Sequence, residues 1–479
     1  KHGLAALAGH ENYKYKYNSL SLTRTGFQYP GQTELDNATL TESTGGSYED
    51  NQTLESYFSN VNYNFDQKYL VSGSVRTDGS SRFSPGARWG TFYSVGLGYR
   101  VSQEKFMKNV KWVNDLKLRA SYGEQGNENI GLYYQYANYF YANGTGNFVA
   151  YTRPANADLA WEKNKATDFG VDAVLFNNRL QVTIDYFNKV SDNLLFDVPL
   201  ALSTAFPTAY QNVGSMRNYG WEFAFGYNAV RKKDFDWRVD LNFSTYKNEI
   251  TKLPPAQQKT GIISGTKKLM EGKSIYDFWL REFAGVDAAT GEAMYYRDVL
   301  GTDGNPTGQR VLTNTIANAS YYYVGGSALP KISGGITNSF RYRNFDLSVL
   351  ATFAYGGKFY DGNYAGIMHS GSYGIAWQTD ILNRWQKPGD VTNVPKLNTS
   401  TLATQDGTSS RFLFDASYFN IKNISLGYSL STKDAQKLHL SGLKFTATID
   451  NAWLFTAKSG MDPQRSFAGT SDATYPIYR

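Results

Sequence analysis

The sequence lacks cysteine, long apolar runs and clustered charge. With no cysteine among 479 residues, a disulfide scaffold is excluded, although this absence fits an envelope protein as well as a cytosolic one. No run of about 18 apolar residues occurs, which excludes a protein that spans a membrane with helices. The 48 basic and 42 acidic residues are dispersed, so nucleic-acid binding has little support.

Aromatic residues are abundant for so polar a chain. Phe, Trp and Tyr make up 16% of the residues, yet the mean hydropathy is −0.47. A membrane β-barrel with a polar lumen reconciles these two values. Half of each of its strands is apolar, while the other half and the loops are polar.

The segment Phe235–Phe243 shows this division most clearly. Its odd positions are large and apolar, whereas its even positions are Asp236, Arg238, Asp240 and Asn242. Successive side chains of a strand point to opposite faces, so one face is apolar and the other is polar. A half-buried strand of a soluble sheet fits this pattern, and so does a barrel strand between lipid and a wet lumen.

Segments with the same period-two alternation recur along the whole chain and predict about thirteen strands. The clearest are Tyr57–Phe65, Tyr69–Arg76, Thr91–Val101, Leu116–Tyr122, Leu180–Tyr186, Phe223–Ala229, Phe235–Tyr246, Ile332–Tyr342, Phe345–Tyr355 and Leu443–Ile449. Weaker segments are Leu4–Tyr15, Thr167–Leu175 and Tyr418–Leu430. In Thr91–Val101 the expected outer face carries Tyr93, Val95, Leu97 and Tyr99.

The connections between these segments alternate in length. The short ones are Asp66–Gln67, Asn177–Asn178, Val230–Asp234 and Arg343–Asn344. The long ones cover roughly 19–54, 78–90, 124–158, 192–217, 248–330 and 356–412. Outer-membrane barrels have short periplasmic turns and long extracellular loops, whereas a soluble sandwich has no reason to sort its loops this way. The expected fold class is therefore all-β, a transmembrane antiparallel β-barrel.

An odd number of strands has a consequence for closure. With the long loops outside, the first strand and the last strand, near Leu443–Phe455, would both run outward. An antiparallel barrel closes only when its last strand pairs antiparallel with its first. Open edges would leave unpaired backbone groups in hydrocarbon. We therefore expect an incomplete barrel.

A series of motifs follows the same course along the chain. It begins with Arg76-Thr-Asp78-Gly79-Ser80-Ser81-Arg82-Phe83 and Arg88-Trp89-Gly90-Thr-Phe92. It continues with Leu116–Gly123, Asn212-Val-Gly214, Asn218-Tyr-Gly220-Trp-Glu222, Gly285-Val-Asp287, Asn423–Tyr428 and Ser459–Pro463. In content and order these motifs resemble the SusC/RagA family of TonB-dependent outer-membrane transporters of the Bacteroidetes. The resemblance covers essentially the whole chain.

This resemblance implies an architecture, a location and partners. The family's barrel has about twenty-two strands around an N-terminal plug. Residues 1–479 resemble its C-terminal part, with no separate soluble domain, and the plug, the early strands and a closing strand have no counterpart here. The implied location is the bacterial outer membrane, with a SusD-like surface lipoprotein over the loops and TonB acting through the plug. The implied activity is import of glycans or peptides across the lipid bilayer, without a cofactor.

The motif residues are predicted to be structural. In the turn after Arg76, Gly79 can take a positive φ and Asp78 can accept bonds from nearby amides. The flanking arginines could hold carboxylates, and the alternative is a substrate site at this loop. The complete set is Arg76, Asp78, Gly79, Arg82, Trp89, Asn212, Gly214 and Gly220.

Aromatic side chains in the long loops are candidate contacts for a ligand or a partner protein, because rings suit stacking and anchoring. They belong to Tyr139-Phe140-Tyr141, Tyr321-Tyr322-Tyr323 and Trp377, and the selected candidates are Tyr139, Tyr141, Tyr322 and Trp377. Packing of one loop on another is the alternative. In the same way, Asp303-Gly304-Asn305 could bind calcium but is better explained as a polar turn.

Catalysis has little support in the sequence. The histidines, His2, His10, His369 and His439, are isolated and lack metal-ligand spacing. No nucleophile-elbow pattern occurs. We therefore expect neither an enzyme nor a metal site. Besides a nutrient importer, a passive porin or structural barrel and a soluble all-β carbohydrate-binding module stay open as alternatives.

Overall fold

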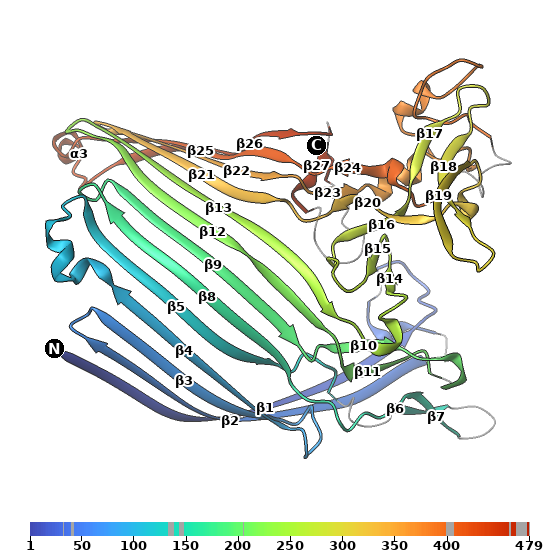
Figure 1. Ribbon diagram of the computed structural model, residues 1–479, viewed down its shortest axis with the longest axis horizontal. Coiled ribbons are helices and arrows are strands. Elements are labelled where there is room, and N and C mark those ends of the chain that lie inside the picture. The colour runs from blue at the N-terminus through green and yellow to red at the C-terminus, as the bar shows by residue number, and fades with distance from the viewer. Residues whose placement is uncertain are drawn as a thin grey trace. The chain divides into compact units, whose positions relative to one another are not determined.

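The computed structural model consists mainly of β-strands (Figure 1). It describes residues 1–31, 33–39, 43–132, 138–142, 148–204, 206–398, 407–458, 461–465 and 477–478. Contacts divide the chain into two compact units. The first comprises Lys1–Tyr99, Ala120–Thr167 and Val190–Ser215, and the second comprises Arg100–Arg119, Asp168–Lys189 and Met216–Arg479.

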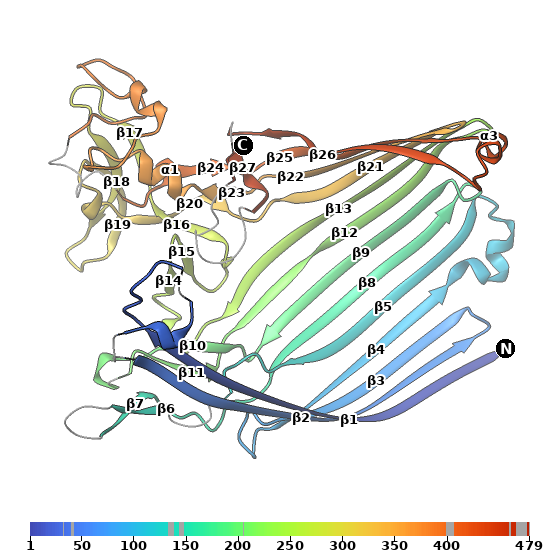
Figure 2. The same ribbon diagram turned by 180° about the vertical axis from the view of Figure 1, so that it is seen from behind.

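The largest sheet has thirteen strands whose order follows the chain, with β1 first and β26 last. They are the long arrows of Figures 1 and 2. The strands are β1 (His2–Arg24), β2 (Ser43–Phe65), β3 (Tyr69–Ser80), β4 (Trp89–Arg100), β5 (Val113–Asn127), β8 (Glu162–Leu175), β9 (Leu180–Asp192), β12 (Ser215–Arg231), β13 (Phe235–Lys252), β21 (Ile332–Tyr342), β22 (Phe345–Tyr355), β25 (Tyr418–Ser429) and β26 (Lys444–Thr456). The described registers between neighbours are antiparallel.

Each predicted segment falls in one of these strands to within one residue at its ends, so the predicted fold class is confirmed in its strand number and pairing. The long connection predicted at 19–54 is wrong in extent. Strands β1 and β2 continue until Arg24 pairs with Ser43. Backbone pairing needs no apolar face once a hairpin has left the lipid, so alternation fades in the sequence before the ladder ends.

Two of the predicted short turns have the positive φ angles expected of tight hairpins. Asp66 and Gln67, between β2 and β3, have φ angles of 54° and 55°. Asn177 and Asn178, between β8 and β9, have 55° and 63°, and Phe176 before them has 54°, so this turn extends over one residue more than predicted. Two consecutive residues with positive φ form the tight turn whose twist matches that of a hairpin. The polar residue types at these positions therefore specify the hairpins locally.

The long connections carry smaller sheets. These are β6 (Asn138–Ala142) with β7 (Phe148–Arg153), β10 (Leu195–Pro199) with β11 (Thr208–Asn212), β14 (Ile262–Ser264) with β15 (Lys267–Leu269), β16 (Asp277–Arg281) and β20 (Tyr321–Ser327), β17 (Phe283–Val286) with β18 (Ala293–Leu300) and β19 (Pro306–Thr313), β23 (Lys358–Tyr360) with β24 (Leu413–Asp415), and β27 (Met461–Asp462) with β28 (Ile477–Tyr478). The α-helices of the described residues are α1 (Gly362–Ile367) and α3 (Thr432–Lys437). None of the described helices has the length and apolar character needed to cross a membrane.

The strands divide into an apolar face and a polar face, as the alternation predicts. On β4, Val95 and Leu97 are 45% and 55% exposed, while Phe92 on the opposite face is buried. On β13, Phe243 stacks on Phe223 of β12 with ring centroids 4.7 Å apart. The polar face of the second unit carries ion pairs, as between Arg119 and Asp172 at 2.7 Å.

A small core lies at the loop ends of the first unit. Phe83, Leu159 and Trp161 are buried there together with Phe92. The Trp161 ring lies 5.4 Å from that of Phe83 and 5.6 Å from that of Phe92. Its indole Nε1 donates to the Arg88 carbonyl at 2.8 Å. Aromatic packing therefore fixes the loop that carries the Asp-Gly-Ser-Ser motif.

Candidate functional site

The loop between β13 and β21 presents a sheet face that is rich in rings and cations. This loop contains the sheet β14-β15-β16-β20 (Figure 1). Residues of β16 alternate between its two faces. Phe278 and Leu280 point into the loop's core and are buried. Trp279 and Arg281 therefore lie on the opposite face.

Strand β20 contributes to the same face through its register with β16. Trp279 pairs with Tyr323, and Arg281 pairs with Tyr321. Directly paired residues share a face. The Trp279 ring meets the Tyr323 ring edge-on at 4.8 Å and stacks on the Tyr321 ring at 6.3 Å. Three aromatic rings thus form one contiguous group.

A basic side chain lies over each of these rings. Lys268 Nζ is 4.4 Å from the Trp279 centroid and Lys273 Nζ is 4.9 Å from the Tyr323 centroid. The Arg281 guanidinium carbon is 4.4 Å from the Tyr321 centroid. Each contact is a cation–π interaction, which leaves the N–H donors on the far side of the cation available. We name this group the cationic aromatic face: Lys268, Lys273, Trp279, Arg281, Tyr321 and Tyr323.

The electrostatic balance of the cationic aromatic face is positive. Among the described residues, no carboxylate lies within ion-pair distance of Lys268, Lys273 or Arg281. By the same alternation Asp277 of β16 lies on this face. Its carboxylate accepts the Ser274 amide at 3.1 Å and keeps its negative charge, so the three cations and Asp277 together leave a net charge of +2 (three minus one). Burial, and then the charge of Asp277, raise the pKa of Tyr323 to about 12, so its phenol stays neutral at physiological pH.

Tyr322 lies on the opposite face of β20, where its polar groups are already engaged. Its hydroxyl donates to Asp298 at 2.7 Å. The Arg310 guanidinium covers its ring at 3.8 Å and is paired with Glu282 at 2.9 Å. The sequence analysis selected Tyr322 and not its neighbours. Period-two alternation within Tyr321–Tyr323 is the signal that would have separated the two faces.

Trp377 packs on another residue of its own loop. Its indole Nε1 donates to the His369 carbonyl at 3.1 Å, and its ring stacks on the His369 imidazole at 5.1 Å. His369 Nδ1 accepts the amides of Gly371 and Ser372 at 3.2 and 2.8 Å. These contacts give Trp377 a part in loop packing.

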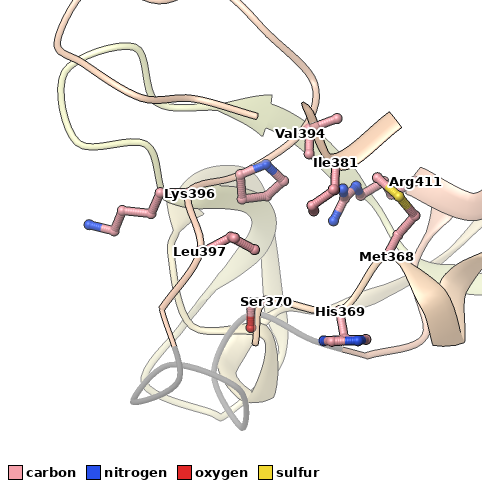
Figure 3. A pocket seen from close by; sticks show the side chains of 9 residues that line it. Met368, His369, Ser370, Ile381, Val394, Lys396, Leu397 and Arg411 are labelled. Carbon is pink, nitrogen blue, oxygen red and sulfur yellow. The ribbon is translucent and has the colours of Figure 1, made fainter. Parts of the chain in front are cut away.

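A pocket beside His369 is too small for a nutrient. Met368, His369 and Arg411 are among its lining residues (Figure 3). The space in it that is open to a water-sized molecule is about 10 Å³, which is roughly the space that one water molecule needs. The other two selected residues, Tyr139 and Tyr141, belong to β6, whose side chains lie outside the described residues.

Arg76 ties the first three strands together on one face. From β3 its Nε donates to Asp78 at 2.7 Å. Its Nη2 donates to Glu11 of β1 and to Ser56 of β2, each at 2.9 Å. A guanidinium can serve several acceptors at once. In these contacts Arg76 and Asp78 cross-link strands.

Arg82 and Asn212 hold loop segments in a similar way. Arg82 Nη2 donates to Gln52 at 3.1 Å, and its Nε lies 3.9 Å from Glu128. The Asn212 amide both accepts from the Ala160 N–H and donates to the Ala160 carbonyl, each at 2.8 Å. Such a reciprocal pair imitates a step of a β-ladder.

The motif glycines stand where a side chain would collide or where φ is positive. The positive φ expected at Gly79 is not found, because Gly79 lies in strand β3 and pairs with Trp89. A Cβ there would lie 2.8 Å from the Trp89 ring, which covers that position. A Cβ at Gly220 would collide with the backbone carbonyl of Thr245 on β13. Gly214 has a φ of 86°, which side chains disfavour. Close approach and backbone geometry account for these residues.

Metal binding finds no geometric support in the described part of the chain, where no three His, Cys, Asp or Glu residues are grouped suitably. In the segment considered for calcium, both carboxylate oxygens of Asp303 accept bonds from Asn305, at 3.0 and 2.9 Å. Those bonds lower the pKa of Asp303. This geometry is that of a polar turn.

Long antiparallel strands with one apolar and one charged face, joined by tight turns at one end and structured loops at the other, define the wall of an outer-membrane β-barrel. Comparison with known families agrees with this class. The chain belongs to the TonB dependent receptor-like, beta-barrel family, whose pattern matches residues 3–452.

Relatives and solved structures support this assignment. TonB-dependent receptor P39 of Formosa agariphila is 29% identical over 98% of this chain and 49% of its own length. TonB-dependent receptor SusC of Bacteroides thetaiotaomicron is 30% identical over 90% of this chain and 43% of its own length. The solved structure of the RagAB peptide transporter matches with a TM-score of 0.85 and 28% sequence identity. The match covers 98% of this chain and 51% of the transporter chain. The chain thus spans about half the length of the curated relatives that it matches.

Proposed function

We propose that the complete protein imports oligosaccharides or peptides across the outer membrane in a TonB-dependent manner. The single observation that carries this proposal is the likeness to the RagAB peptide transporter, which extends over 98% of this chain at a TM-score of 0.85. The family is one of receptors and transporters rather than enzymes. Within the complete protein, this chain supplies barrel wall and extracellular loops.

We further propose that a SusD-like surface lipoprotein covers these loops. Support comes from the motif resemblance to the SusC/RagA family and from the relative named SusC. The loops are built as ordered platforms: the sheets β14-β15-β16-β20 and β17-β18-β19 are paired strands with buried side chains. An ordered surface loses less conformational entropy when a partner docks.

An uptake assay in the native host tests the proposal. A strain that lacks the complete gene and a strain that lacks TonB function would each be given labelled oligosaccharides and labelled peptides. We expect uptake of one of these classes to fall to background in both strains and to return when the complete gene is restored.

Two results would contradict the proposal. Uptake that requires the gene but persists without TonB would identify a passive porin. Unchanged uptake of every probe in the gene deletion would remove the importer function. Affinity purification of the complete protein in mild detergent, followed by mass spectrometry, tests the lipoprotein separately, and recovery of the barrel alone would refute that partner.

A further inference from the structure

We propose that the cationic aromatic face binds acidic oligosaccharides through the carboxylates of their uronic acid units. This inference rests on the proposed import function and specifies the substrate chemistry for it. The face lies in the loop between β13 and β21, on the surface of β16 and β20 opposite the buried Phe278 and Leu280.

The three cations are held in place by aromatic rings, and no carboxylate of the described residues forms an ion pair with them. Lys268, Lys273 and Arg281 each rest on an aromatic ring, at 4.4 to 4.9 Å from its centroid. A ring orders a long basic side chain yet leaves its full positive charge and its outward donors for another acceptor.

Arg310 of the same loop is a cation that has both a ring contact and a carboxylate partner. Arg310 also lies over an aromatic ring, that of Tyr322, but its guanidinium is additionally paired with Glu282 at 2.9 Å. The loop therefore pairs a cation on one face with a carboxylate. On the other face, none of the three cations has an ion pair among the described residues, and the face keeps a net charge of +2 when Asp277 is included. A surface with this charge pattern is complementary to an anion.

The second step is that the cations surround apolar ring surface. Trp279 and Tyr323 lie 4.8 Å apart, and Tyr321, which is 36% exposed, stacks beside them. A pyranose offers a flat array of C–H groups that packs on an aromatic ring. A uronate adds a carboxylate at the edge of the same ring, where the lysine and arginine donors lie. Each sugar unit thus carries both groups that the face recognises.

An acidic peptide fits this surface less well. A glutamate places its carboxylate at the end of a flexible chain and brings no flat apolar surface with it, so more rotamer freedom is lost on binding. A peptide would instead be expected to pair with an exposed strand edge through its backbone. A neutral sugar would stack on the rings but leave the basic groups without an acceptor.

The test is calorimetric titration of the purified full-length protein with a galacturonic acid oligomer, a neutral galactose oligomer and a glutamate-rich peptide. The variant Lys268→Met/Lys273→Met keeps the hydrophobic stems and removes two charges. The control Lys252→Met/Lys259→Met removes two charges from exposed lysines near the same loop. Tyr321→Ala is a second variant, which tests the rings without changing the charge.

We expect the galacturonic acid oligomer to bind at least about tenfold more tightly than the neutral oligomer, which corresponds to the effect of one good charged contact. Lys268→Met/Lys273→Met should weaken that binding by about tenfold or more, whereas Lys252→Met/Lys259→Met should leave it within about twofold. Added salt should weaken binding to the unmodified protein more than to the Lys268→Met/Lys273→Met variant.

Equal affinity for the acidic and neutral oligomers would overturn the inference. An equal loss of affinity in Lys268→Met/Lys273→Met and in Lys252→Met/Lys259→Met would overturn it too. Binding of the glutamate-rich peptide alone would overturn it as well. TonB-dependent uptake of another nutrient without galacturonate binding would refute this inference and leave the proposed function intact. Galacturonate binding at this face without TonB-dependent uptake would support this inference and refute the proposed function.

Discussion

An arginine at position 95 tests whether the exposed face of β4 lies against lipid. Strand β4 has 12 residues, and at roughly 3.4 Å per residue it is about 41 Å long. A tilt of about 45° gives it a height of about 29 Å, close to the hydrocarbon thickness. Val95 is the seventh residue, near the middle, and its side chain is 45% exposed.

At that depth, Val95→Arg should destabilise the barrel by about 2–4 kcal/mol, because a charged group would be placed near the bilayer midplane. The matched control is Ser94→Arg on the same strand, one residue away on the opposite face. The Ser94 hydroxyl bonds only to that of Ser74, at 2.7 Å, among its described partners. A charge on that wet face should cost less than about 1 kcal/mol.

The measurement is denaturant unfolding of the full-length protein in lipid vesicles, followed by tryptophan fluorescence, to which these 479 residues contribute 9 tryptophans. The same experiment in detergent should reduce the difference between the two variants, because a micelle deforms around a charge more readily than a bilayer. Equal free energies of unfolding for Val95→Arg and Ser94→Arg in vesicles would refute the assignment of the faces.

Three further predictions concern the loops and the sheet. His369→Ala should remove the acceptor of the Gly371 and Ser372 amides. Their hydrogen exchange should then become faster, with a loss of about 1–3 kcal/mol in the free energy of protection. His369→Asn keeps an acceptor at that position and should largely preserve the protection. Lys458→Met should destabilise its loop by about 3–5 kcal/mol, because Asp361 is fully buried and pairs with Lys458 at 3.0 Å. Adding Asp361→Asn should recover much of this stability. Resistance of the loop to protease in the single and double variants measures both effects. Gly220→Ala should reduce the yield of folded barrel in a heat-modifiability gel, whereas Gly86→Ala, with open space at its Cβ, should not.

Local chemistry explains why the strands could be read from the sequence. Each barrel strand contacts lipid on one side and water on the other, so about ten consecutive residues are enough to show its alternation of apolar and polar side chains. The turn at Asp66–Gln67 is equally local, since its residue types tolerate the positive φ that the hairpin requires. The extensions of β1 and β2 beyond the lipid were missed, because no apolar face is needed there.

The loop surface could not be read in the same way. Trp279, Tyr321 and Lys268 lie in separate parts of one long connection, and each residue alone fits an ordinary polar loop. Their meeting depends on the pairing of β15, β16 and β20. Alternation within Tyr321–Tyr323 separates two faces, but it does not indicate which face pairs with the ring of Trp279 and which is covered by Arg310. Tyr322 was therefore predicted in place of its neighbours.

The sequence by itself thus determined the barrel strands, their faces and the tight turns, because alternation and turn geometry depend on residues that are neighbours in the chain. Only the tertiary structure decided which loop aromatics share a surface and which cations have no carboxylate partner within the described part of the chain. Those properties arise from strand pairing across long connections, where the physical interaction joins residues that are distant in the chain.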